Sequence, residues 1–186
     1  MKYISTGIVQ KNSTEEILNI SHCSGLFQLT GLQAALWLNG RTGFVETDHA
    51  ADCKELKHLA AMGLVILAEE TQAGEFFALT HAVLICTEKR KSILSLTKDE
   101  KLVLTWLREA GLHLSVAELV YLIDHKVSPD GGLLGEENRQ ALVQQIYTED
   151  TIFDNLLEFQ MAHASCRDQT VRTLMSLLKK GYLILI

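Results

Sequence analysis

The chain has 186 residues, of which 47 % are hydrophobic and one is proline, and its formal net charge is −6. This length allows one large domain or two small ones, and the apolar content excludes a disordered chain. Its apolar runs are far shorter than the roughly 20 residues that span a bilayer, and its N-terminal segment lacks the apolar core of a secretion signal. The four cysteines are widely spaced, as is typical of reduced thiols. We therefore expect a cytoplasmic protein with no membrane partner.

The negative charge is spread over the whole chain. Residues 1–93 contain eight lysines and arginines against ten acidic residues, and residues 94–186 contain nine against thirteen. This balance excludes a general nucleic-acid coating protein, because neutralisation of phosphates supplies most non-specific affinity. The charge balance does not exclude a sequence-specific regulator that is basic along one helix only.

In chain order, the first half predicts a strand or extended arm over residues 2–10 and helices over residues 13–23, 29–39 and 48–62. The first helix is predicted from the capping box of Ser13 and Glu16. Leu64–Ala68 and Phe76–Leu79 are expected to pair as a hairpin around the turn at residues 71–74. Thr80 is then expected to cap a helix over residues 81–91.

The second half predicts helices over residues 98–110, 136–147, 151–164 and 167–180, and a further helix capped by Ser115. The segment 128–132 reads as a loop, and Tyr182–Ile186 reads as a strand. We place the boundary near Ile93, which gives modules over residues 1–93 and 94–186. We also expect Tyr3–Val9 to pair with Tyr182–Ile186, either within one chain or across a dimer, and to cover its edge. A free N-terminal arm is the alternative.

One pattern occurs twice. Residues 54–67 and 172–185 each read as an amphipathic helix that stops at a glycine and continues into a short apolar run. Glycine suits the left-handed position that ends a helix, and the residues after it suit a strand. A second, approximate repeat relates residues 29–40 to residues 96–111. Each segment contains Leu-Thr, then Trp-Leu and then Gly, in that order.

Residues 29–88 resemble a winged-helix domain of bacterial regulators such as the MarR, PadR and ArsR families. The resemblance rests on Leu29-Thr30 and on the run from Glu55-Leu56 through Met62-Gly63-Leu64-Val65 to Leu79-Thr80. The second half resembles the domain less well, with an extra helix and no second wing strand. The resemblance implies a mainly α fold with short antiparallel β hairpins, arranged as tandem winged-helix modules. It also implies a DNA-binding transcriptional regulator that acts as a homodimer.

Ten residues are candidates for contact with duplex DNA, because exposed basic and amide side chains contact phosphates and base edges. They lie on two helices and in the segment between the halves: Lys54, Lys57, His58, Lys89, Arg90, Lys91, Arg167, Gln169, Arg172 and Lys179. Acidic residues near the first of these helices oppose this interpretation: Asp48, Asp52, Glu55, Glu69, Glu70 and Glu75. The alternative is therefore a winged-helix subunit that binds other proteins without direct DNA contact.

Histidine and cysteine recur as neighbours in His22-Cys23, His49/Cys53, His81/Cys86 and His163/Cys166. A four-ligand metal site would need two such pairs to meet in space, so buried cysteines are the simpler interpretation. No nucleophile or phosphate-loop motif is present in the sequence. We therefore expect neither an enzyme nor a cofactor.

Overall fold

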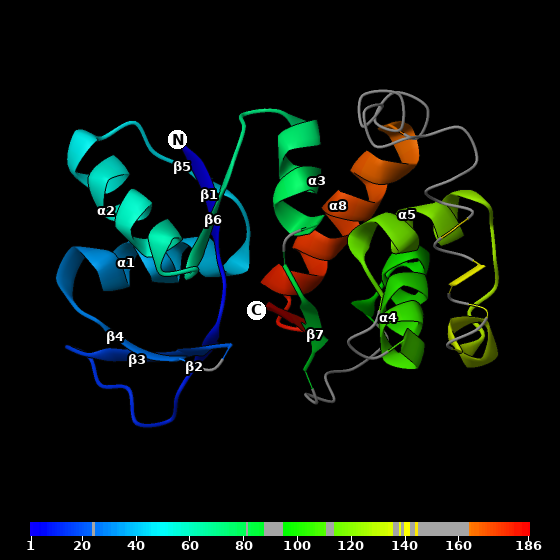
Figure 1. The fold of residues 1–186 in the computed structure, drawn as a ribbon, viewed down its shortest axis with the longest axis horizontal. Helices are drawn as coiled ribbons and strands as arrows, with labels where there is room; N and C mark the ends of the chain where they lie inside the picture. The colour runs from blue at the N-terminus through cyan, green and yellow to red at the C-terminus, as the bar shows by residue number, and fades with distance from the viewer. Residues whose placement is uncertain are drawn as a thin grey trace. The chain divides into compact units, whose positions relative to one another are not determined.

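The computed structural model describes residues 1–23, 25–80, 82–87, 95–110, 114–135, 138, 140–141, 144 and 164–186. The chain divides into two compact units, one of Met1–Lys89 with Leu177–Ile186 and the other of Arg90–Ser176. Both contain helices, and the strands form small antiparallel sheets (Figure 1). The expected combination of helices with short antiparallel β structure is confirmed at this level. The expected boundary near Ile93 stays a prediction, and the last ten residues belong with the first unit.

The central strand of the first sheet comes from the N-terminal segment. Strand β1 (Lys2–Ser5) lies between β5 (Val45–Glu46) and β6 (Val65–Ala68), and both neighbours are antiparallel to it. The strand predicted at residues 64–68 is therefore present. Its partner, however, is the N-terminal strand.

A second antiparallel sheet replaces the helix predicted over residues 13–23. It consists of β2 (Ile8–Val9), β3 (Leu18–His22) and β4 (Gly25–Leu29), in that order. The Ser13 hydroxyl, expected to cap a helix, instead accepts a hydrogen bond from the Asn19 amide at 3.0 Å and donates one to the Asn19 carbonyl at 3.2 Å. The helix prediction is wrong because this side chain closes a loop between two strands.

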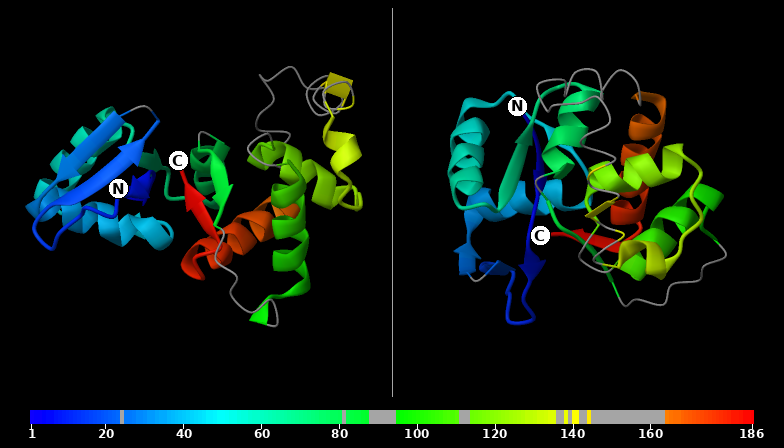
Figure 2. Two further views of the ribbon diagram at one scale, coloured as in Figure 1. Left: turned by 90° about the horizontal axis from the view of Figure 1, so that it is seen from below. Right: turned by 45° about the vertical axis from the view of Figure 1, so that its right-hand side comes forward.

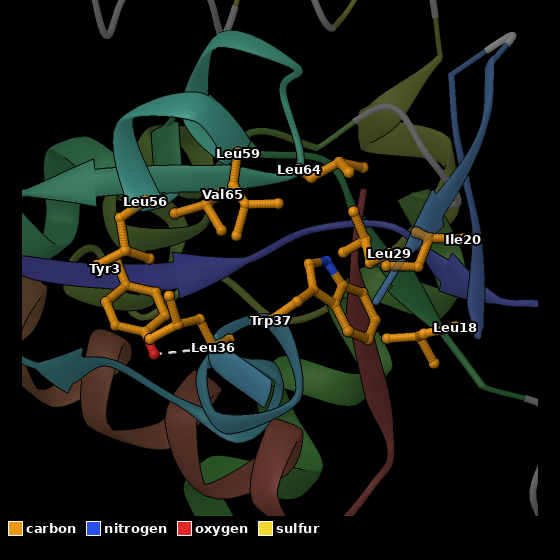
Figure 3. Close-up of a cluster of buried hydrophobic side chains, with 10 residues drawn as sticks. All are labelled: Tyr3, Leu18, Ile20, Leu29, Leu36, Trp37, Leu56, Leu59, Leu64 and Val65. Atoms are coloured by element: carbon orange, nitrogen blue, oxygen red, sulfur yellow. Dashed lines mark hydrogen bonds between the residues drawn. The ribbon is translucent and has the colours of Figure 1, made fainter. Parts of the chain in front are cut away.

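The helices predicted next are both present, as α1 (Gly31–Asn39) and α2 (Ala50–Ala61), with the short 3₁₀ helix η1 (Gly40–Thr42) after α1. Leu36 and Trp37 of α1 pack with Leu56 and Leu59 of α2 in one hydrophobic core, to which strands β1, β3, β4 and β6 contribute (Figure 3). The Trp37 indole Nε1 donates to the Thr6 carbonyl at 2.9 Å, so the buried ring has a polar partner. Leu32 and Leu38 lie on the exposed side of α1.

The predicted hairpin wing is wrong, because residues 76–79 lie in helix α3 (Gln72–Thr80). The Thr71 hydroxyl accepts from the Gly74 amide at 2.9 Å, which is the geometry of a helix N-cap. Thr71 thus starts a helix where the sequence suggested a turn. Thr80, expected to cap the next helix, ends this one, and strand β7 (Leu84–Cys86) follows in place of that helix.

The C-terminal strand β8 (Leu183–Leu185) pairs with β7 in an antiparallel sheet (Figure 2). The expected pairing of the N-terminal segment with Tyr182–Ile186 within one chain is therefore wrong. A single backbone hydrogen bond joins the two segments, from the Gly7 amide to the Leu185 carbonyl at 2.8 Å. The edge of β8 is covered, but mainly by a strand that the sequence analysis had assigned to a helix.

The second unit contains α4 (Lys98–Ala110), α5 (Val116–Asp124), the 3₁₀ helix η3 (Gly131–Leu134) and most of α8 (Ala164–Lys179). The predicted cap is confirmed at Ser115, whose hydroxyl accepts from the Glu118 amide while Glu118 accepts from the Ser115 amide. The predicted last helix is confirmed as α8. The helices predicted over residues 136–147 and 151–164 lie mostly outside the described residues.

The repeated helix-glycine-strand pattern corresponds to one repeated structure. Gly63 and Gly181 have φ angles of 75° and 74°. At each, the glycine amide bonds back to the third residue before it, and the next amide bonds back to the fifth residue before itself, which is the Schellman ending of a helix. The strand after each glycine pairs antiparallel with an earlier strand, β6 with β1 and β8 with β7.

Candidate functional site

The outward face of α2 is the best-defined part of the candidate DNA-binding surface. Lys54, Lys57 and His58 are all exposed, and Leu56 and Leu59 between them are completely buried. The spacing of a helix produces this division, because residues three and four apart share one face. The structure therefore brings three of the predicted contact residues together on one exposed surface.

The two acidic residues within α2 are engaged by side chains of the same unit. Asp52 accepts a hydrogen bond from the Thr47 hydroxyl at 2.8 Å, and Glu55 accepts one from the Gln33 side-chain amide at 2.8 Å. Both are half-buried, and the remaining exposed positions of the helix are alanines. The exposed face of α2 is thus made of basic and small side chains, which lets a partner approach closely.

Exposed carboxylates lie before the N-terminus of α2, at Glu46 and Asp48. Glu46 forms an ion pair with Lys2 at 3.0 Å, and Glu75 forms one with the same lysine at 2.7 Å. The hydrogen bond to Glu75 is the largest cause of the raised pKa of Lys2, and Glu46 adds to it against the effect of burial. One of the six acidic residues that oppose DNA contact, Glu75, is therefore paired with Lys2.

On α8 the structure separates the four predicted residues. Arg167 is only 6 % exposed, and its guanidinium contacts the Asp168 carboxylate at 2.8 Å through both Nε and Nη2. Gln169 is exposed, and its side chain donates to Asp99 at 3.0 Å. Arg172 and Lys179 are exposed. A direct role for Arg167 in contacting DNA does not fit its burial, whereas Arg172 and Lys179 remain accessible.

The repeat places α2 and α8 in register. If Gly63 is matched with Gly181, then Leu56 and Leu59 match Leu174 and Leu177, and all four leucines are fully buried. The same match places Lys54 opposite Arg172, and both are exposed. Helices α2 and α8 thus each present a basic residue at the equivalent position.

The basic triplet Lys89–Lys91 lies outside the described residues, and so do His81 and His163 of the histidine-cysteine pairs. In the part of the chain that the structure describes, no group of three metal-ligating side chains comes together. Cys166 donates weakly to the Val120 carbonyl at 3.6 Å, and burial raises the pKa of its thiol, with a further effect of the nearby Asp124. That thiol is a poor nucleophile near neutral pH.

None of the described helices is both long and apolar enough to cross a membrane. Comparison of the chain with protein-family models, with curated proteins and with solved structures found no match in any of the three.

Sequence reasoning missed two features of these helices. It did not detect that Arg167 is buried, although its position next to Asp168 allowed an ion pair. It also missed the contact of Thr6 with Gly63, in which the hydroxyl donates to the glycine carbonyl at 2.7 Å. No local signal indicates that contact, because 57 residues separate the two partners.

Proposed function

We propose that this protein is a DNA-binding transcriptional regulator whose duplex contacts are made by the exposed face of α2. In this proposal α2 and α8 are the contacting helices of two related modules, each derived from the winged-helix pattern. In a winged helix a two-stranded hairpin follows the contacting helix. Here a single strand follows each helix, β6 after α2 and β8 after α8, and each pairs with a strand from earlier in the chain. The observation that supports the proposal most directly is the exposed group Lys54, Lys57 and His58 on one helix face.

The chemistry of that face fits a phosphate backbone. Lysine ammonium groups neutralise phosphates and release counterions, which is the main source of affinity for duplex DNA. The exposed alanines Ala50 and Ala61 at the two ends of the helix add little bulk between it and a groove. The carboxylates of Asp52 and Glu55 each accept a hydrogen bond from a side chain of the same unit, so both are already engaged within the protein.

The repeat supports a second contact of the same kind. Arg172 is exposed at the position of α8 that matches Lys54 of α2. Arginine can contact both phosphates and guanine edges, so it can replace lysine at such a position. This one equivalent basic position supports contact through both helices, although Met175 and Ser176 stand at the positions of Lys57 and His58.

The second candidate function is a subunit that binds another protein. Glu46, Asp48, Glu69 and Glu70 are exposed in the first unit, and the whole chain is acidic. These carboxylates favour a basic partner and oppose phosphate. DNA binding would use the lysines of the first unit, whereas binding of a basic protein would use its carboxylates. Mutation of the lysines therefore distinguishes the two functions.

The test is the salt dependence of binding to labelled duplex fragments, measured by fluorescence anisotropy from about 50 to 200 mM salt, a range over which phosphate-driven affinity changes strongly. Lys54→Gln and Lys57→Gln should each reduce the slope of log K against log salt by about one. Arg172→Gln should do the same if α8 also contacts the duplex.

Lys11→Gln is the matched control, because Lys11 is an exposed lysine of the same unit on a different segment. Its slope should equal that of the unchanged protein. Absence of binding at the lowest salt would contradict the proposal and favour the protein-binding function. An equal loss of slope in Lys11→Gln would show general attraction without a defined DNA-binding face.

A further inference from the structure

A histidine and a cysteine at the end of strand β3 form a side-chain pair that the proposed DNA-binding function does not use. His22 is the last residue of β3, and Cys23 follows it directly. The Cys23 Sγ lies 4.0 Å from the His22 Nε2, which is within reach of a hydrogen bond to sulfur. Cys23 is exposed, whereas the other three cysteines are half-buried. It departs from the expected burial of the cysteines, and a reagent in solution can reach its thiol.

The backbone of Cys23 is a second, independent observation. Its φ angle is 50°, in the left-handed region that side chains other than asparagine and aspartate rarely adopt. His22 pairs with Gly25 across β3 and β4, so the connection between the strands is short, and glycine or asparagine is the usual residue there. Unfavourable backbone conformations of this kind concentrate at functional sites. Here the conformation accompanies an exposed thiol beside an imidazole.

Two glycines leave room for the His22 side chain and limit its movement. A Cβ added at Gly63 would lie 3.2 Å from the His22 Cε1 and 3.5 Å from its Nδ1, and a Cβ added at Gly7 would lie 3.6 Å from the His22 Cβ. One edge of the ring therefore lies against the backbone of Gly63, while its Nε2 is near the Cys23 sulfur. Because the side chain is half-buried in this position, the imidazole stays beside the thiol.

We propose that Cys23 is a site of reversible S-thiolation by low-molecular-weight disulfides, with His22 as the general base. The His22 Nε2 takes the proton of the Cys23 thiol, and the thiolate attacks one sulfur of the disulfide. A bond forms between that sulfur and the Cys23 Sγ while the disulfide of the reagent breaks. The other half of the reagent leaves as a thiolate and accepts the proton from His22.

The products of this exchange are a mixed disulfide on the protein and one free small thiol. Cys23 is oxidised and one half of the reagent is reduced, so no further oxidant is needed. The reverse attack by an excess of small thiol restores Cys23. The site uses no residue of the proposed DNA-binding face and does not rest on that proposal.

Two other cysteines provide a comparison within the same molecule. The Cys53 thiol donates to the Thr47 carbonyl at 3.9 Å, and the Cys166 thiol donates to the Val120 carbonyl at 3.6 Å. A backbone carbonyl accepts a hydrogen bond but does not take up the proton in a reaction. Both cysteines are also half-buried, so they should react with a dissolved disulfide more slowly than the exposed cysteine.

The first experiment compares Cys23 in the folded protein with the same residue in the chain unfolded by urea. Oxidised glutathione near neutral pH is the probe, and mass spectrometry of peptides measures the modification at each cysteine with time. If His22 removes the proton, Cys23 should react at least about tenfold faster in the folded protein. A folded rate equal to or below the unfolded rate would overturn the proposal, because exposure alone then accounts for the reactivity.

The second experiment removes the base. His22→Phe keeps a ring beside Gly63 but has no nitrogen, so the rate at Cys23 should fall at least about tenfold. His49→Phe is the matched control, because His49 is an exposed histidine of the same unit, and it should leave this rate unchanged. Circular dichroism melting shows that each variant folds. An unaltered rate in His22→Phe, or an equal loss in His49→Phe, would contradict the role of His22.

The third experiment separates a chemical role of His22 from a structural one. His22→Ala should react as slowly as His22→Phe, and imidazole added to the buffer should raise the rate at Cys23 in the alanine variant more than in the unchanged protein. A folded alanine variant that imidazole does not accelerate would refute general-base action. Cys23→Ser should remove the fast mass gain of the whole protein, and a fast gain that persists would place the reactive thiol elsewhere.

Discussion

The hydroxyl of Thr6 donates a hydrogen bond of 2.7 Å to the carbonyl of Gly63, and its amide donates one of 3.0 Å to the carbonyl of Leu64. Thr87 repeats both contacts, to Gly181 at 2.8 Å and to Tyr182 at 2.9 Å. In each case a threonine after an earlier strand thus holds the glycine that ends a helix, α2 or α8. This threonine clasp, formed by Thr6 with Gly63 and by Thr87 with Gly181, occurs twice within the first unit, to which all four residues belong.

Loss of the first threonine clasp should destabilise the protein. Thr6 is almost completely buried, so Thr6→Val should lower the free energy of unfolding by about 1 to 3 kcal/mol, because the Gly63 carbonyl loses its hydroxyl partner. Thr6→Ser should retain most of the stability. Urea unfolding measures the effect. Thr80→Val is the control, since Thr80 also donates to a carbonyl, that of Phe77, but is exposed, and equal losses in the two valine variants would contradict the role of the clasp.

The two helix-ending glycines should each be intolerant of a side chain. Gly63→Ala and Gly181→Ala force alanine into the left-handed region, at a cost of about 1 to 2 kcal/mol. An added Cβ at Gly63 would also lie 3.2 Å from the His22 ring. Thermal unfolding of both variants, with Gly132→Ala as a control without a positive φ, checks this prediction. Unchanged melting temperatures would mean that the glycines are dispensable.

Stability should fall at alkaline pH partly because of Lys2. Its pKa is raised above 10.5, first by the hydrogen bond to Glu75. The stabilisation is therefore complete below the unfolded pKa and is lost as the pH rises through the folded value. Lys2→Gln should be less stable than the unchanged protein at pH 8, and the difference should shrink between about pH 10 and 12. Urea unfolding across this range measures it.

Tyr3 also contributes to the loss of stability at alkaline pH, and its contribution must be measured apart from that of Lys2. Burial raises the pKa of the Tyr3 hydroxyl, and the charge of Asp52 raises it further. The sign is the same as for Lys2, since the folded state favours the protonated form and loses stability as the pH rises. Tyr3→Phe should remove this second contribution while Lys2 remains. A pH profile of Lys2→Gln that runs parallel to that of the unchanged protein would refute the assignment to Lys2.

The cysteines should differ in reactivity. Cys23 is exposed, whereas Cys166 is half-buried and its thiol pKa is raised. Alkylation by iodoacetamide at pH 8, followed by mass spectrometry, should modify Cys23 well before Cys166, because the thiolate is the reacting form. Cys166→Ser should leave the rate at Cys23 unchanged. Similar rates at the two positions in the folded protein would contradict the burial of Cys166.

The sequence predicted the elements whose signals are local. The endings of α2 and α8 depend on a glycine that must adopt a positive φ, and the start of α5 depends on the reciprocal bonds of Ser115 and Glu118. Exposure of Lys54, Lys57 and His58 followed from the same helical spacing. The predictions of DNA binding and of a homodimer remain to be tested.

Local signals failed where a residue had two possible partners. Ser13 has the sequence context of a helix cap, yet its hydroxyl bonds to Asn19 and closes a loop. Residues 71–74 have the composition of a turn, yet Thr71 caps α3. In both cases one hydroxyl can satisfy either geometry, and the choice depends on which neighbouring side chains become buried.

By itself, the sequence determined where α2 and α8 end and that a strand follows each, because helix spacing and glycine conformation act within a few residues. Only the tertiary structure decided that β6 pairs with β1 and β8 with β7, that Arg167 is buried and that Leu32 and Leu38 are exposed. Strand pairing and burial depend on residues far apart in the chain, whose contacts form only when the elements pack together.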